Sequence, residues 1–173
     1  MKKIVLLFVL AFTFFSCDDG DLTLEEIDLT TGSTVDACSD QSGVTLLFKI
    51  NGAETLILEV PNDIIINEVT EDSDTPRTAT LSGDASSFYR SFESNISNSY
   101  FCDQLPSDTP ITLEYTAQSG SVEVITVEAF NEENVLIGYD HTILLTNVVY
   151  TGTNGQDIRY GEFPYGTFRT ALP

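Results

Sequence analysis

The chain of 173 residues contains no tryptophan, one histidine, and only seven lysines and arginines against 27 aspartates and glutamates. With a formal net charge of −20, it is repelled by phosphate backbones, which excludes a nucleic-acid-binding function. The lone histidine, His141, leaves too few soft ligands for a zinc site, and no G-x-S-x-G motif surrounds any serine. These absences predict a protein that is not an enzyme and needs no cofactor.

The chain also lacks an apolar run long enough to cross a bilayer. Residues 4–15 carry no charge, but as a helix they would cover only about 18 Å of the roughly 30 Å hydrocarbon core. Lys2 and Lys3 precede this run and the small residue Ser16 follows it, which is the arrangement of a secretory signal. We therefore expect residues 1–16 to be a signal peptide.

The segment Phe14-Phe15-Ser16-Cys17 resembles the lipobox of bacterial lipoproteins, and Asp18-Asp19-Gly20-Asp21 follows it directly. An acidic cluster after the lipidated cysteine is similar to outer-membrane lipoproteins of the Bacteroidota type, where it is associated with display on the cell surface. The resemblance covers about 20 residues, and Phe14 and Phe15 stand where leucine and a small residue are commoner. It implies acyl chains such as palmitate on Cys17, which would attach the protein to the outer membrane. Secretion without a lipid is the alternative.

The two remaining cysteines, Cys38 and Cys102, are most simply a disulfide, because the predicted location is outside the cytoplasm. On the chain-entropy account, closing this loop stabilises the fold by about 4 kcal/mol. The acidic, small-residue composition of residues 17–37 predicts a lipid anchor and extended tether. Residues 38–173 are then expected to form one domain.

Hydrophobic alternation with a period of two predicts a series of short strands. Asn51-Gly52 predicts a hairpin turn, Ser119-Gly120 and residues 131–134 predict further turns, and the aromatic tail from Thr151 predicts an edge strand. The predicted strands cover residues 44–50, 55–60, 64–69, 78–81, 111–117, 122–129, 135–139 and 142–150.

Residues 84–99 are ambiguous, because Phe88, Phe92 and Ile96 form a helical stripe behind a possible N-cap at Asp84. We expect a short helix or an irregular loop there. Seven to nine strands with frequent turns predict an all-β chain, namely an Ig-like antiparallel β-sandwich, with a small β-barrel as the runner-up. The missing tryptophan means that "Ig-like" refers to the architecture only.

Candidate ligand-binding residues are few. Asp72 and Asp74 offer oxygen ligands for calcium, although turns favour aspartate at such positions anyway. His141 lies between two predicted strands, where we expect a surface position. The leading hypothesis is an envelope lipoprotein with a non-catalytic binding or structural domain and a protein or glycan partner; the alternative is a carbohydrate-binding accessory protein. Rings that could stack on sugars are Tyr89, Tyr100, Phe101, Tyr150, Tyr160, Phe163, Tyr165 and Phe168.

Overall fold

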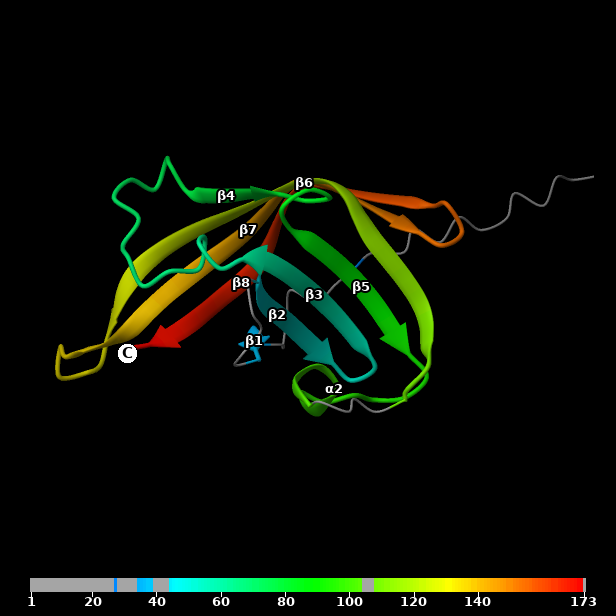
Figure 1. Ribbon diagram of the computed structural model, residues 1–173, viewed down its shortest axis with the longest axis horizontal. Helices are drawn as coiled ribbons and strands as arrows, with labels where there is room; N and C mark the ends of the chain where they lie inside the picture. Colours follow the sequence, from blue (N-terminus) through cyan, green and yellow to red (C-terminus); the bar gives the residue numbers. More distant parts are fainter. Residues whose placement is uncertain (1–26, 28–33, 39–43, 104–107, 173) are drawn as a thin grey trace, which may run out of the picture.

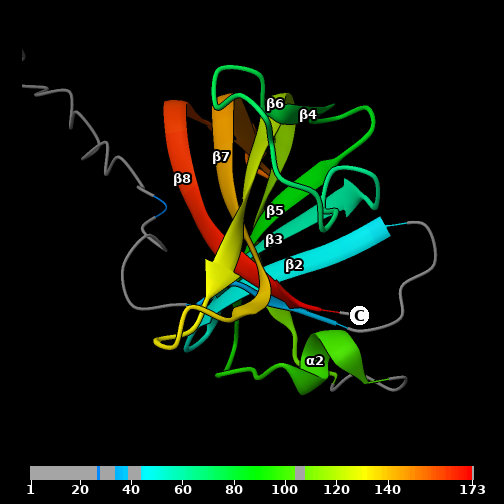
Figure 2. The same cartoon turned by 90° about the vertical axis from the view of Figure 1, so that its left-hand side faces the viewer.

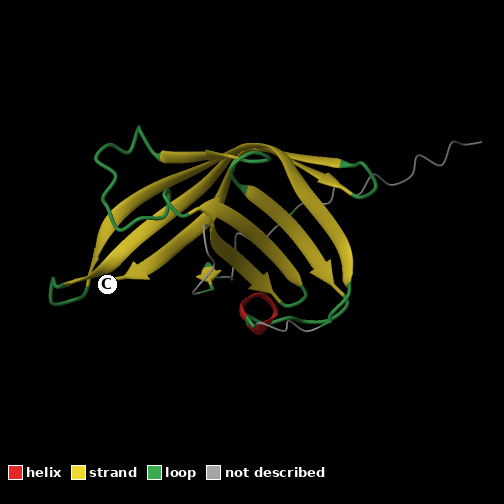
Figure 3. Cartoon of the chain, viewed as in Figure 1, coloured by secondary structure: helices red, strands yellow, loops and turns green. Residues whose placement is uncertain are grey.

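The predicted all-β fold is confirmed by a computed structural model, which describes residues 27, 34–38, 44–103 and 108–172 (Figure 1, Figure 3). A single helical turn, α2 (Ser99–Cys102), accompanies the strands in this part of the chain. The strands are β1 (Asp36–Ala37), β2 (Val44–Asn51), β3 (Glu54–Pro61), β4 (Arg77–Thr80), β5 (Ser86–Phe92), β6 (Ile111–Phe130), β7 (Leu136–Gly152) and β8 (Asp157–Ala171).

All the strands belong to one antiparallel sheet in the order β1-β2-β3-β5-β6-β7-β8, and β4 pairs with β6 beside this path. The sheet curls, so that the strands follow one another along an arc from β8 round to β2 (Figure 2). The two walls that face each other are therefore parts of one sheet, and the fold is a half-barrel that combines features of the predicted sandwich and barrel.

The sheet bends within β6, at a point where the sequence analysis predicted a turn. That prediction is wrong, because β6 continues through Ser119-Gly120 with two irregularities in its pairing to β7 (Figure 1). Gly120 has a φ of 120°, and a Cβ there would lie 2.8 Å from both the carbonyl oxygen of Thr146 and the Cα of Val148. Only glycine fits this conformation and this close approach.

The inner face of the curled sheet carries the main core. Two buried tyrosines cross it: the Tyr165 hydroxyl of β8 donates to the Leu56 carbonyl of β3 at 3.1 Å, and the Tyr150 hydroxyl of β7 lies 2.7 Å from the Ser87 hydroxyl of β5. Ser87 in turn donates to the Ile57 carbonyl. These hydrogen bonds join the two walls across the interior. Fully buried apolar neighbours include Leu47, Leu58, Val60, Tyr115, Val122, Val124, Leu145 and Val148.

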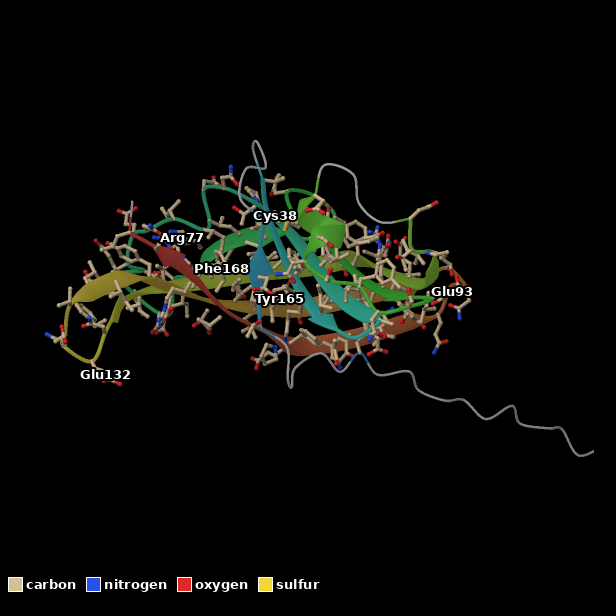
Figure 4. All side chains as sticks on the ribbon, turned by 90° about the horizontal axis from the view of Figure 1, so that it is seen from below. Cys38, Arg77, Glu93, Glu132, Tyr165 and Phe168 are labelled. Atoms are coloured by element: carbon tan, nitrogen blue, oxygen red, sulfur yellow. A yellow bond between two sulfur atoms is a disulfide. The ribbon has the colours of Figure 1, made fainter. Side chains whose placement is uncertain are left out.

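A smaller cluster lies on the outer face of β2 and β3, beneath α2. The ring of Phe101 stacks on Phe48 with 4.4 Å between centroids. The predicted disulfide is confirmed: Cys38 and Cys102 are bonded, with 5.2 Å between their Cα atoms. Cys38 directly follows β1, a two-residue strand that the sequence analysis missed, and the bridge therefore fastens α2 to the β1 edge of the sheet (Figure 4).

Two further expectations are wrong. Residues 84–99 contain strand β5 rather than a helix, and β5 lies centrally between β3 and β6. Residues 64–69 are not a strand but part of the irregular connection from β3 to β4. In that connection Ile64 is buried in the main core, so its apolar character serves packing rather than sheet pairing.

Ile27 belongs to the predicted tether, yet its side chain is buried in the main core. Its backbone N–H donates to the Tyr160 hydroxyl of β8 at 2.9 Å. Val35 also contacts β8, because it lies next to Gly166. A Cβ added at Gly166 would lie only 2.8 Å from the Cγ2 atom of Val35. Residues from before β1 therefore pack against β8.

Candidate functional site

His141 is the buried centre of a cluster of polar side chains that extends to the surface. It was expected at the surface between two strands, which is wrong, because β7 runs through it without interruption and its side chain is 0% exposed. Pairing places it opposite Thr126 of β6 and Phe168 of β8. We name the cluster the histidine layer and define it by five residues from five segments: Asn67, Arg77, Thr126, His141 and Thr170.

One half of the histidine layer leads from β4 to the imidazole. The Arg77 guanidinium donates to the Thr126 hydroxyl at 3.0 Å, and that hydroxyl lies 2.9 Å from the Nδ1 atom of His141. Arg77 also donates to the Glu68 carbonyl at 2.6 Å, and the Thr70 hydroxyl accepts the Thr126 N–H at 3.0 Å. These bonds hold the β3–β4 connection against the sheet.

The other half leads from the imidazole to the C-terminal end of β8. The Nε2 atom of His141 lies 2.9 Å from the Thr170 hydroxyl, which donates to the Asn67 side-chain oxygen. The Asn67 amide is oriented by its NH₂ group, which donates to the Ala171 carbonyl at 3.1 Å. A carbonyl only accepts, so this contact requires the nitrogen of the amide on that side.

This chain of contacts fixes the tautomer of His141. Thr170 has one hydroxyl proton and gives it to Asn67, so it must accept the proton of Nε2–H. Nδ1 is then the unprotonated nitrogen and accepts the hydroxyl proton of Thr126, whose oxygen accepts from Arg77. With this assignment each contact on the path from Arg77 to Asn67 joins one donor to one acceptor, and the ring is neutral.

The surroundings of the ring favour this neutral form. Burial lowers the pKa of His141, the positive charge of Arg77 lowers it further, and the neighbouring carboxylate of Asp140 opposes both. Asp140 is itself bound by Arg169 through two contacts of 2.7 Å, and these hydrogen bonds lower the pKa of its carboxyl group. Because both ring nitrogens are occupied, His141 cannot act as a base or a metal ligand unless the layer opens.

The other predicted site residues lie apart from the histidine layer. Cys17, the predicted lipidation site, lies outside the described residues. Asp72 caps a turn: its carboxylate accepts the N–H of Asp74 at 2.9 Å, and its carbonyl accepts the N–H of Thr75 at 3.0 Å. Within residues 27, 34–38, 44–103 and 108–172, no three His, Cys, Asp or Glu side chains converge as metal ligands would.

The aromatic rings that were candidates for sugar stacking are packed against the protein. Tyr89, Tyr150, Phe163 and Tyr165 are buried, and the other four rings are half-buried. All four contact another ring: Phe101 stacks on Phe48, Tyr100 meets Phe92 edge-on at 4.9 Å, Tyr160 meets Phe163 at 5.0 Å, and Phe168 stacks on His141 at 6.3 Å.

Sequence reasoning missed Phe130, the one exposed aromatic ring among the described residues, with 48% of its surface accessible. It ends β6 at the hairpin to β7, and Glu132 of the following turn marks one extremity of the molecule (Figure 4). Its position next to a predicted turn could have indicated this exposure, because a side chain beside the turn of a long hairpin has few neighbours to cover it.

An open cavity of about 310 Å³ lies along β7 and β8, where Tyr160 also holds Ile27. Its one cationic side chain, Arg159, is paired with Asp157 at 2.7 Å. The cavity is lined by Asn147, Val148, Val149, Arg159, Tyr160 and Gly161.

In the part of the chain that the structure describes, no helix has the length and apolar character needed to span a membrane. No protein-family model, no curated protein and no solved structure matches the chain.

Proposed function

We propose that the protein is a surface-displayed lipoprotein of the outer membrane whose β-domain is a non-catalytic binding or structural module. The anchor part of the proposal rests on the sequence, in which Ser16-Cys17 ends an apolar segment and an acidic cluster follows. Attachment through two or more acyl chains on Cys17 would be stable, whereas a single chain would be marginal.

The observation that supports a non-catalytic domain is how the interior uses its polar groups. The only imidazole of the chain is neutral and bonded at both nitrogens within the histidine layer. The interior hydroxyls of Tyr150 and Tyr165 are likewise engaged in bonds between the two walls. Groups that could carry out chemistry are thus used to hold the sheet in shape, which leaves the surface to carry function.

The carbohydrate-binding alternative would require exposed rings arranged on one face. The eight candidate rings are buried or half-buried, and most of them contact other rings. This packing favours a protein-binding or structural module over a sugar platform.

Lipidation is tested by growing cells with an alkyne analogue of palmitate and measuring label on the purified protein. We expect label on the wild type and none on Cys17→Ser, while the Cys38→Ser/Cys102→Ser variant keeps it as a matched cysteine control. Mass spectrometry of the mature N-terminus locates the modification. A processed protein with an unmodified Cys17 would refute the anchor.

Surface display is tested by treating intact cells with protease. The anchored wild type should be cleaved, and a periplasmic protein in the same cells should survive as the control. The Asp18→Asn/Asp19→Asn/Asp21→Asn variant is expected to keep its palmitate label and to become protected. Protection of the wild type would contradict the surface location but not the lipid anchor.

A further inference from the structure

We propose that the tip of the β6–β7 hairpin docks into an apolar groove of a protein partner, and that lysine or arginine side chains rim this groove. We define the hairpin tip as Val127 to Ile137. The proposal rests on the proposed binding function of the domain, because it names the surface that binds and the chemistry of what it binds.

The first observation is where the exposed apolar side chains gather. Eight large hydrophobic residues of the described chain are exposed, and four of them fall within the hairpin tip, where Val127 and Phe130 are each 48% exposed and Val135 is 54% exposed. Two more lie beside the hairpin tip. Leu172 follows Ala171, which pairs with Gly138 of β7, and Val69 precedes Thr70, whose backbone N–H donates to the Thr126 carbonyl. A concentration of this kind marks an interaction surface.

The second observation is that both faces of the hairpin tip are apolar. Val127 and Phe130 are three residues apart in β6, so alternation along the strand places them on opposite faces of the hairpin tip. Ile137, which is 38% exposed, lies at the register shift between the pairs Ala129–Gly138 and Phe130–Leu136. A flat partner would cover one face only, whereas a groove covers both.

The third observation is that the turn is held in one conformation before it binds anything. The Asn131 side-chain oxygen accepts the N–H groups of Glu133 at 3.0 Å and Val135 at 2.8 Å. The backbone N–H of Asn134 also bonds the Asn131 carbonyl, and Asn134 takes a positive φ of 58°. A turn that is already ordered loses little conformational entropy on docking.

The charge around the hairpin tip indicates what the groove must carry. Glu132 and Glu133 are exposed at the apex and Glu128 is exposed beside Val127, while Glu68 and Glu71 are exposed on the neighbouring connection. The nearby cation Arg169 is already paired with Asp140. An apolar centre with an acidic border is complementary to an apolar groove with a basic rim.

The same charges argue against two other occupants. A second copy of the chain would have to supply cations, but among the residues that the structure describes Lys49 is buried, and Arg77, Arg90, Arg159 and Arg169 are all bonded to groups of their own chain. An anionic lipid surface would repel the glutamates at the apex. The partner is therefore a different protein that brings its own lysines or arginines.

The test is photo-crosslinking in the native host, with the full-length anchored chain carrying benzoylphenylalanine in place of Phe130. The control carries the same group in place of Ile111, which is 43% exposed at the far end of β6. We expect one discrete protein adduct from position 130 and none from position 111. The partner peptide at the crosslink, sequenced by mass spectrometry, should combine apolar residues with lysine or arginine.

Charge reversal then tests complementarity in the same assay. Glu132→Lys/Glu133→Lys should lower the adduct yield about tenfold. This is the loss expected if each of the two charge reversals weakens binding about threefold. The control Asp84→Lys/Glu93→Lys changes the charge equally at exposed positions away from the hairpin tip, and Glu93 lies at the opposite end of the molecule (Figure 4). It should leave the yield unchanged.

An adduct with a second copy or with phospholipid, equal adducts from both positions, no adduct at all, or a yield unaffected by charge reversal would each overturn the proposal. Palmitate labelling of the same cells separates this failure from failure of the anchor. A labelled protein without the adduct refutes the docking surface alone, and an unlabelled protein with the adduct refutes the anchor alone.

Discussion

Acidification is expected to destabilise this domain through one side chain, His141. Its neutral ring is 0% exposed, accepts a proton from Thr126 and donates one to Thr170. Protonating Nδ1 would turn the Thr126 hydroxyl away and place a buried cation near the half-buried Arg77. Burial and Arg77 accordingly lower the pKa of His141 in the folded state.

The sign and size of the effect follow from proton linkage. In the unfolded chain His141 titrates near its ordinary pKa of 6.5, so below that pH the unfolded state binds more protons than the folded state, and stability falls as pH falls. The slope is at most about 1.4 kcal/mol per pH unit, which gives up to about 1.4 kcal/mol between neutral pH and pH 5.5 while the folded ring stays neutral. Above pH 6.5 this contribution is complete.

The assay is urea unfolding at pH 7.5, 6.5 and 5.5, combined with a ¹⁵N NMR measurement of the imidazole nitrogens. The matched variant is His141→Gln, whose side chain can accept from Thr126 and donate to Thr170 but does not titrate. We expect the wild type to lose stability over this interval and the variant to be nearly flat. A folded ring that titrates at or above pH 6.5, or that carries its proton on Nδ1, would refute the reasoning.

Three further predictions concern stability and use the same unfolding assay at neutral pH. Cys38→Ser/Cys102→Ser should lower the free energy of unfolding by about 4 kcal/mol, because the loop of 64 residues is no longer closed, and a loss below about 1 kcal/mol would contradict this. Gly120→Ala should cost about 3 kcal/mol or more, since a Cβ meets backbone atoms at 2.8 Å, whereas Gly155→Ala, with a positive φ of 80° but open space, should cost about 1 kcal/mol. Tyr165→Phe should cost about 1–2 kcal/mol by removing the bond to the Leu56 carbonyl, and an unchanged midpoint would show that the two walls do not depend on it.

The strand pattern was predictable wherever apolar residues recur with a period of two between turn signals. Alternation located β2, β3, β4 and much of β6, and Asn51-Gly52 correctly located the first hairpin. The disulfide was predictable because an even pair of cysteines in a domain predicted to lie outside the cytoplasm has few other uses. These features depend on local sequence and on composition.

Strand β5 was missed because its apolar spacing fits two periods. Phe88 and Phe92 are four residues apart, which places them on one face of a helix and is also an even spacing in a strand. The serine-rich segment lacks the β-branched residues that would have decided between the two. Pairing with β3 and β6 makes this segment a strand, and sequence patterns do not show which distant segments pair.

His141 was misplaced for a related reason. A polar residue between Asp140 and Thr142 is normally at the surface, and burial becomes favourable only when partners satisfy both ring nitrogens. Those partners, Thr126 and Thr170, are 15 and 29 residues away in the sequence. Nothing local indicates that they meet, so a buried polar layer of this kind becomes visible only in the structure.

The histidine layer and the hairpin tip are connected through the same two strands. Thr126 and His141 pair directly across β6 and β7, four residues before Phe130 and four residues after Ile137. Arg77 and Asn67 bind the β3–β4 connection to this point, and Asp140 and Arg169 fasten β7 to β8 on the opposite face. The Thr126–His141 pair, which is bonded on both sides, thus lies at the base of the hairpin tip. A hairpin fixed at its base and ordered at its turn presents its side chains in one arrangement. The hydrogen bonds of the histidine layer therefore help to hold the exposed apolar side chains of the hairpin tip in position.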